Sequence, residues 1–115
     1  MNRVRTSVLA LAGVVVLGAA ACGGGGSGQN VALGVNVAGN KMTPDKLSAR
    51  QDDTVTLKVT ADKAETIHLH GYEYKFEMKP GETQTKTFKA DKTGSFEVEI
   101  EDSSTHLGEL DVQPR

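Results

Sequence analysis

An antiparallel β-sandwich or small barrel of about seven short strands is the fold that this sequence pattern predicts. Three observations support it. Apolar and polar residues alternate with a period of two from about residue 31 to the C-terminus. Turn-forming residues such as Gly, Pro and Asp recur about every 8–12 residues between these alternating segments. No stretch in this region shows the apolar periodicity of an amphipathic helix.

The alternation is clearest in "TVTLKVTA" (54–61). Val55, Leu57 and Val59 share one face there, and threonine and lysine residues share the other. Similar segments occur along the rest of the domain. The predicted strands are 31–37, 54–61, 66–70, 72–78, 83–90, 95–100 and 106–112.

The segments between these strands have the composition of turns and loops. Residues 41–53 are interpreted as a connection with a turn at Pro44. Pro80 and Gly81 suit the central positions of a type II turn, because glycine tolerates the positive φ required at the second of them. Residues 101–105 are expected to form the last loop.

The first 21 residues have the layout of an export signal. "MNRVR" is basic and is followed by a short apolar run at about residues 8–17. This run is shorter than the roughly 20 apolar residues of a membrane-spanning helix. The segment closes on "LGAAAC", which resembles a bacterial lipobox, and its Cys22 is the only cysteine in the chain. We therefore expect a lipoprotein signal peptide over 1–21 and lipid attachment at Cys22.

The residues after the signal are expected to tether a folded domain. "GGGGSGQN" has a flexible composition, so 22–30 is interpreted as the lipidated cysteine and a glycine-rich tether. The domain then covers 31–115 and contains no cysteine for a disulfide. Without Arg3 and Arg5 of the signal, the chain has 11 basic and 15 acidic residues, a net charge of −4. This charge balance, with no basic cluster, argues against nucleic-acid binding.

The order of turns and strands from about residue 55 to 112 resembles the cupredoxin fold. The markers are the "KPGE" turn before a strand, "FKADKTGSFEVEI" as two late strands, and "GELDV" as the last one. The chain looks most like the small single-domain cupredoxins of bacterial envelopes, which share the plastocyanin and azurin fold. This resemblance implies a Greek-key β-sandwich and a function connected with copper.

The resemblance breaks at the ligands of a type 1 (blue) copper site. Such a site needs a cysteine thiolate, two histidines and a weak axial ligand. In the cupredoxin pattern C-x-x-H-x-x-M-x-G-x-L-x-V, Gly108 and Leu110 match the end. His106 then stands at the methionine, Ser103 at the histidine and Ile100 at the cysteine. The resemblance therefore implies no type 1 copper centre in this chain.

The stretch "HLHGY" (68–72) also resembles the H-x-x-H-L-H-G stretch of multicopper oxidases, a larger cupredoxin family. His68 and His70 match two of its histidines, and Glu65 stands at the first. In those enzymes the two matching histidines serve a copper cluster built from many histidines. This chain has three histidines in all, too few for such a cluster.

His68 and His70 are competent metal ligands on geometric grounds. Residues two apart on a strand point to the same side, with Cα atoms about 6.5–7 Å apart. A third ligand is expected from His106 if the last loop folds back over this strand. Other residues that could complete the site are Met78, Glu65, Glu73 and Glu101. A nitrogen-rich set favours copper, with zinc as the alternative, over magnesium or calcium.

Two other interpretations of these histidines stay open. With Tyr72 and Tyr74, which have the same parity, they can form a polar outer surface or a protein interface. They can also serve only as structural hydrogen-bonding residues. The acidic run "EIED" (99–102) is interpreted as a solvated strand end. No enzymatic activity is expected, because the sequence offers no recognisable nucleophile–base set, phosphate-binding loop or paired-carboxylate motif.

These observations lead to one hypothesis and one alternative. The hypothesis is an extracytoplasmic lipoprotein, anchored to the cell membrane, that binds or delivers copper through His68, His70 and His106. The alternative is a metal-free module that interacts with another envelope protein.

The anchor is directly testable. Cys22→Ser should release the protein from the membrane fraction or leave an unprocessed precursor, because the thiol that would carry the lipid is gone. Membrane fractionation and the mass of the N-terminal peptide check this. A variant that fractionates and matures like the parent would contradict the lipoprotein prediction.

Overall fold

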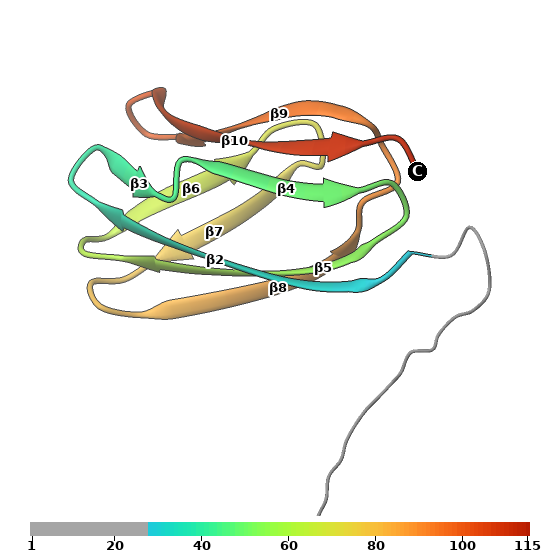
Figure 1. The fold of residues 1–115 in the computed structure, drawn as a ribbon. Helices are drawn as coiled ribbons and strands as arrows, with labels where there is room; N and C mark the ends of the chain where they lie inside the picture. Colours follow the sequence, from blue (N-terminus) through green and yellow to red (C-terminus); the bar gives the residue numbers. More distant parts are fainter. Residues whose placement is uncertain (1–27) are drawn as a thin grey trace, which may run out of the picture.

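The structure, a computed structural model, describes residues 28–115 as two facing β-sheets without a helix (Figure 1). The strands are β2 (Asn30–Ala38), β3 (Lys41–Thr43), β4 (Lys46–Arg50), β5 (Thr54–Ala61), β6 (Glu65–Leu69), β7 (Tyr74–Met78), β8 (Thr83–Lys89), β9 (Gly94–Ile100) and β10 (Thr105–Gln113). Their order is β4-β10-β9-β6-β7 in one sheet and β3-β2-β5-β8 in the other. The predicted all-β sandwich is thus confirmed. No helix in residues 28–115 has the length and apolar character needed to cross a membrane.

The expected N-terminal features lie mostly outside the described residues. These are the signal peptide over 1–21, the lipid attachment at Cys22, and residues 23–27 of the tether. The end of the expected tether is described: the backbone N–H of Thr54 donates to the carbonyl of Gln29, and Asn30 begins β2.

The described part has nine strands, two more than the sequence predicted. The additional strands, β3 and β4, lie within 41–53, which was interpreted as a connection. Both are short and flank Pro44, so the turn signal concealed them. Their apolar residues are nevertheless buried: Met42 lies in the core from β3, and Leu47 and Ala49 from β4.

Two strand pairs are parallel, so the prediction of a purely antiparallel sandwich was wrong in this respect. β2 pairs in parallel with β5, and β4 pairs in parallel with β10. The chain moves from one sheet to the other between β3 and β4, and returns between β4 and β5. Alternation along a strand shows which side chains face inward, but it does not show the direction of the neighbouring strand.

The core fills the space between the two sheets and follows the predicted alternation. Val55, Leu57 and Val59 of β5 are buried, as are Val98 and Ile100 of β9. The largest side chains that are almost fully buried are Phe76, Ile67, Leu69, Leu110, Val37, Val55 and Val59. Burial of this apolar surface, at about 25 cal/mol per Å², is the main stabilising contribution in a domain without disulfides.

The outer faces of the two sheets differ in chemistry. On the four-stranded sheet, β5 and β8 place threonines opposite one another. The hydroxyls of Thr60 and Thr83 are 2.7 Å apart, and those of Thr56 and Thr87 are 3.2 Å apart. This face is hydroxyl-rich, whereas the histidines and most of their acidic neighbours lie on the five-stranded sheet.

The turn between β7 and β8 has the predicted type II character. Gly81 has a φ of +74°, which only glycine adopts without strain. The N–H of Glu82 donates to the carbonyl of Lys79 at 3.0 Å and closes the turn.

Asp53 joins the two ends of the described chain. Its buried carboxylate accepts hydrogen bonds from the backbone N–H groups of Gln29 and Arg50, each at 2.9 Å, and pairs with the guanidinium of Arg115. Burial alone would raise the pKa of Asp53. The backbone hydrogen bonds from Gln29 and Arg50 and the charge of Arg115 outweigh that effect and lower it.

Asp53→Asn should destabilise the domain. The amide keeps one acceptor but presents its NH₂ group to a backbone donor, which leaves a buried donor unsatisfied at a cost of about 1–3 kcal/mol. Because the pKa of Asp53 is lowered, the stabilisation is present above its unfolded-state value of 3.8 and is lost as pH falls through the folded-state value. The difference in the free energy of unfolding between Asp53→Asn and the parent, measured by urea unfolding, should therefore become smaller at acid pH.

Asp52→Asn is the matched control for this prediction. It removes the same charge one residue earlier, where the φ of +70° suits asparagine. Its free energy of unfolding should stay within about 0.5 kcal/mol of the parent. Equal deficits in the two variants would contradict the role assigned to Asp53.

Candidate metal centre

β6 directs the two neighbouring histidines to the outer face of the five-stranded sheet. Ile67 and Leu69 point into the core, so His68 points outward, and His70 follows on the same side directly after the strand. The backbone N–H of His70 donates to the carbonyl of Glu97 at 2.9 Å and so extends the contact with β9. The two imidazole centroids are 4.4 Å apart. The predicted convergence of His68 and His70 is therefore present in the structure.

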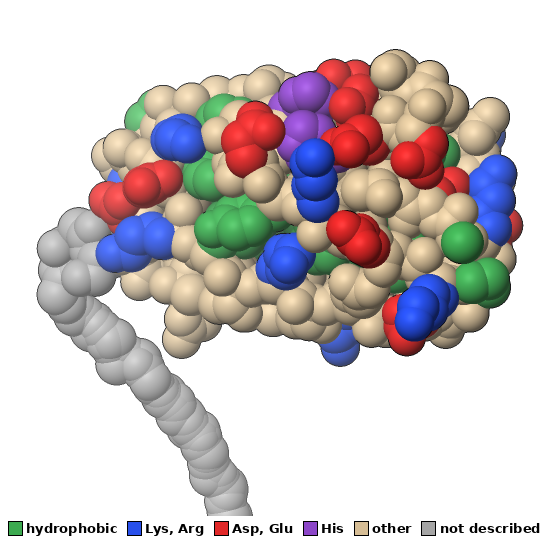
Figure 2. Space-filling model, turned by 180° about the vertical axis from the view of Figure 1, so that it is seen from behind, with side chains coloured by type: hydrophobic (Ala, Val, Ile, Leu, Met, Phe, Trp, Pro, Cys, Tyr) green, Lys and Arg blue, Asp and Glu red, His purple; other side chains and the backbone are tan. Residues whose placement is uncertain are grey.

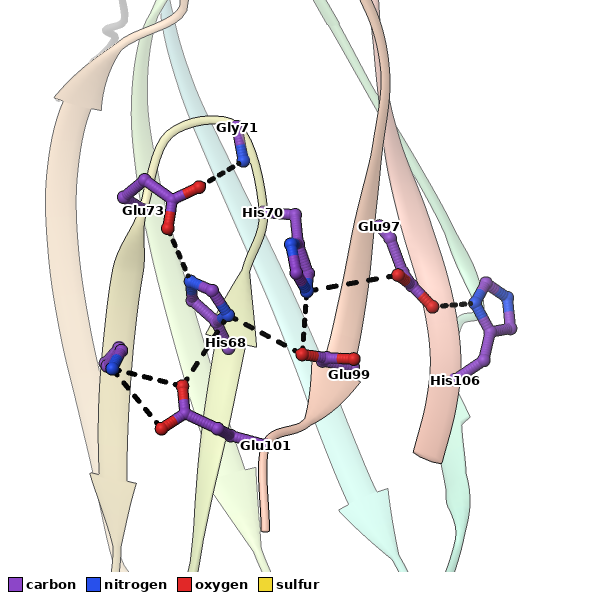
Figure 3. Close-up of polar contacts among 9 residues, drawn as sticks. His68, His70, Gly71, Glu73, Glu97, Glu99, Glu101 and His106 are labelled. Atoms are coloured by element: carbon purple, nitrogen blue, oxygen red, sulfur yellow. Dashed lines mark hydrogen bonds and ion pairs between the residues drawn. The ribbon is translucent and has the colours of Figure 1, made fainter. Parts of the chain in front are cut away.

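β9 supplies the third member of the group. Val98 and Ile100 point into the core, and Glu99 lies between them on the outer face, in register with His68. Oε2 of Glu99 accepts a hydrogen bond from Nε2 of His70 at 2.7 Å and lies 3.6 Å from Nδ1 of His68 (Figure 3). One ligand atom from each of these three residues lies within 4.8 Å of the other two.

Glu99 is not among the ligands predicted from the sequence, because the run "EIED" (99–102) is interpreted there as a solvated strand end. The signal that could have found it is the alternation of "FEVEI" (96–100) itself. This alternation places glutamates on the face opposite the core. What the sequence did not reveal is that β9 lies beside β6, with Glu99 opposite His68.

Two further carboxylates lie close to the ring nitrogens of His68. Nε2 of His68 donates to Oε1 of Glu73 at 3.0 Å, and Nδ1 lies 3.6 Å from Oε1 of Glu101. Lys75 pairs with Glu101 at 3.2 Å. His68 is almost fully buried even though it lies on the outer face of the sheet.

The β6–β7 turn carries Glu73 back towards His68. Gly71 has a φ of +86°, and a Cβ at this position would collide with the ring of Phe96. Its N–H donates to Oε2 of Glu73 at 3.0 Å, which fixes the carboxylate (Figure 3). The glycine of "HLHGY" is therefore required by the turn itself.

The same turn separates the tyrosines from the histidines. Tyr72 packs on Phe88 and Phe96, with ring centroids 5.1 and 4.8 Å away, and Tyr74 packs on Phe88 at 5.0 Å. Both tyrosines lie against the hydrophobic core. The interpretation that they share one outer surface with the histidines was wrong, because the positive φ angles of Gly71 and Glu73 break the strand parity.

His106 lies on β10 and not on a loop folded over β6. A β-bulge between His106 and Gly108 lets both His106 and Glu109 pair with outward-facing residues of β9. Nδ1 of His106 donates to Oε2 of Glu97 at 2.8 Å, and Oε1 of Glu97 lies 4.0 Å from Nε2 of His70. His106 is thus linked to the histidine pair through Glu97 and stands outside the compact group.

The remaining ligands considered from the sequence are divided between the two faces of the sheet. Glu73 and Glu101 contact His68, as described above. Met78 and Glu65 are buried on the core side. Burial raises the pKa of Glu65, and its Oε2 has no hydrogen-bond partner among the described residues.

The positions aligned with the blue-copper pattern have other roles here. Ile100 is buried in the core, and the hydroxyl of Ser103 contacts that of Thr105 at 2.6 Å. None of the described residues is a cysteine. A metal ion bound by residues 28–115 would therefore be held by imidazole and carboxylate groups rather than by a thiolate.

The group carries an excess of negative charge. Glu73, Glu97, Glu99 and Glu101 contact the histidines, and Lys75 is the cation paired within this set, so the net charge is −3 when the histidines are neutral. Figure 2 shows the histidines with acidic side chains gathered around them. Such a site attracts either protons or a metal cation.

The pKa values follow this arrangement. The hydrogen bond with Glu99 raises the pKa of His70 and outweighs the opposing effect of burial, and the charges of Glu99, Glu97 and Glu73 raise this pKa further. The hydrogen bond with His70 lowers the pKa of Glu99. The backbone hydrogen bond from Gly71, and then the bond with His68, lower the pKa of Glu73.

No protein-family model matches the chain, and no curated protein sequence matches it. Several solved structures do. The purple cupredoxin from Nitrosopumilus maritimus matches with a TM-score of 0.53 at 14% identity, over 70% of this chain and 98% of that one. A copper binding protein in the apo form matches with a TM-score of 0.56 at 17% identity, over 77% and 100% of the two chains. A multicopper oxidase from Pseudomonas thermotolerans matches with a TM-score of 0.61 at 20% identity, over 77% and 31%.

These likenesses show that residues 28–115 have the cupredoxin fold, as the sequence predicted. Small cupredoxins match over nearly their whole length. The chain spans only 39% and 31% of the length of two multicopper oxidases that it matches. At these identities the likeness establishes the fold, and the case for a metal rests on the side chains described above.

The contact between His70 and Glu99 makes a testable prediction. In an NMR titration, the pKa of His70 should lie above 6.5 in the parent and fall in Glu99→Gln, because the carboxylate partner is lost. The raised pKa of His70 stabilises the fold below 6.5, and this contribution is lost as pH rises through the folded-state value. The lowered pKa of Glu99 stabilises above 4.5, and this contribution is lost as pH falls through the folded-state value.

Glu82→Gln is the control for this titration. Glu82 lies in the β7–β8 turn and is exposed. The variant therefore removes one negative charge without touching the histidines. An equal fall of the His70 pKa in both variants would attribute the shift to net charge rather than to the hydrogen bond, against the prediction.

Proposed function

We propose that this protein binds copper through His68, His70 and Glu99. The observation that carries the proposal is the convergence of two imidazoles and one carboxylate within 4.8 Å on a cupredoxin fold. Two nitrogen ligands and one oxygen ligand suit copper or zinc, whereas calcium and magnesium prefer all-oxygen sites. The small proteins of similar fold include one described as a copper binding protein, which favours copper over zinc.

The surrounding carboxylates prepare the histidines to act as ligands. Glu73 accepts a hydrogen bond from Nε2 of His68, so Nδ1 faces Glu99 as the free acceptor. A carboxylate that holds the distant nitrogen of a ligating imidazole fixes its tautomer and orientation. On the other side of the group, Nε2 of His70 faces Glu99 directly. A bound copper ion would supply Lewis acidity and a redox couple to this site.

The site serves binding or delivery of the ion rather than catalysis. His70 is about half exposed, so a bound ion would stay accessible to an acceptor. An anchor at Cys22 would hold the domain at the outer side of the cell membrane, where it would exchange copper with other envelope proteins. We include this location and delivery role in the proposal on the strength of the lipobox resemblance in the sequence.

A metal-free interaction module is the second candidate function. Each of the three histidines already contacts a carboxylate: His68 with Glu73, His70 with Glu99 and His106 with Glu97. These contacts provide the histidine side chains with hydrogen-bond partners without any ion. The resulting polar surface would then serve contact with an envelope protein.

Copper titration separates the two functions. The full chain carrying Cys22→Ser, which removes the only thiol, should bind copper in calorimetry without an intense visible band, because that band needs a thiolate. His68→Ala and His70→Ala should each weaken binding by about tenfold or more, the scale of losing even a supporting residue. As the pH is lowered, copper affinity should begin to fall while the pH is still above 6.5. The reason is that the raised pKa of His70 lets protons compete with copper at a higher pH than for an ordinary histidine.

Glu99→Gln should also weaken copper binding, whereas Glu82→Gln, which changes the same charge elsewhere, should leave it unchanged. Undetectable uptake by the parent, or unchanged uptake in the double variant His68→Ala/His70→Ala, would remove copper binding from consideration. The interaction module would then be the better description of the protein.

A further inference from the structure

We propose that His106, Glu97 and His70 form an outer capture site, from which a copper-type divalent cation passes to the inner group of His68, His70 and Glu99. This inference rests on the proposed function. It assigns to His106 and Glu97 a role in loading and release of the ion rather than in holding it at equilibrium.

The contacts form a continuous row across three strands. His106 on β10 donates to Glu97 on β9 at 2.8 Å, and the other oxygen of Glu97 lies 4.0 Å from Nε2 of His70. The same nitrogen of His70 lies 2.7 Å from Glu99. Imidazole and carboxylate groups therefore alternate along the row, as Figure 3 shows.

Exposure decreases along this row from one end to the other. The exposed fraction of the side chain is 61% at His106, 42% at Glu97 and 43% at His70. It falls to 14% at Glu99 and 9% at His68. A hydrated cation can reach the first three side chains directly, whereas the last two are covered by their neighbours.

His70 connects the two sets because its Nε2 faces both Glu97 and Glu99. A cation held by His106, Glu97 and His70 could exchange one carboxylate for the other while keeping the His70 nitrogen. The proton that Nδ1 of His106 shares with Glu97 and the proton that Nε2 of His70 shares with Glu99 must both leave for the solvent as the ion arrives, since an imidazole nitrogen cannot hold a proton and a metal ion together. No redox change is needed for this transfer.

The β-bulge in β10 is the structural basis for the outer set. It shifts the register between His106 and Gly108, so that His106 stands opposite Glu99 but bonds to Glu97. Leu107 and Gly108 are both buried at this point. Bulges commonly redirect a side chain in this way.

Rapid-mixing kinetics test the proposal with Cu²⁺ as the ion and the full chain carrying Cys22→Ser as the parent. His106→Ala and Glu97→Gln should each slow Cu²⁺ association about tenfold, the scale on which local charge changes on-rates. Dissociation of Cu²⁺ should slow by the same factor, because the ion passes through the outer capture site both when it binds and when it leaves. The equilibrium Kd of the inner group should then stay unchanged in His106→Ala, and Glu82→Gln, the charge control, should alter neither rate.

A second arm tests the outer set itself. The variant His68→Ala should keep a weaker Cu²⁺ site, formed by the outer set. The double variant His68→Ala/His106→Ala should lose this site. Together with coupled changes in the two rates, this result supports the proposal.

Two outcomes overturn the capture role while leaving the proposed function intact. One is unchanged association rates in both His106→Ala and Glu97→Gln. The other is a weakened Kd with unchanged association, which would make His106 a ligand of the inner ion. Absence of Cu²⁺ uptake by the parent would overturn both the capture role and the proposed function.

Discussion

The antiparallel pairing of β6 with β9 is the constraint on which the polar chemistry of this domain depends. It places His68 opposite Glu99 and, with the alternation of both strands, leaves the core to Ile67 and Val98. A shift of one residue in this register would send the histidine or the glutamate into the core. The apolar residues therefore fix the candidate metal centre indirectly, because the burial of one face of the sheet determines which side chains stand on the other.

Protons and a metal cation compete for the candidate metal centre. Its four glutamates exceed its one lysine, so the group carries a negative charge that attracts protons or a metal cation. The hydrogen bond between His70 and Glu99 occupies the imidazole nitrogen that a metal ion would need. A metal site made of imidazole and carboxylate groups loses affinity as the pH falls, because protons compete with the ion for the imidazole nitrogens.

The fold could be predicted from the sequence further than the site could. The alternation of β5 and the turn at Gly81 are local properties, and both are as expected. The strands around Pro44 escaped notice because three to five residues are too few to show a period. Glu99 and the link between His106 and Glu97 depend on which strands are neighbours and on a bulge in β10. Those features arise from long-range packing, which no local pattern in a single sequence reports.

The parallel pairing of β2 with β5 has a mechanical consequence. The described chain begins and ends at the same end of the sandwich (Figure 1), and β2 runs from that end between β3 and β5. A force applied to Gln29 along the axis of β2 shears β2 against β5. The hydrogen bonds between these strands, from Asn30 to Val37, then bear the force together and do not break one after another. The histidines belong to the opposite sheet, so a force applied at the N-terminal end is borne by strands that do not form the candidate metal centre.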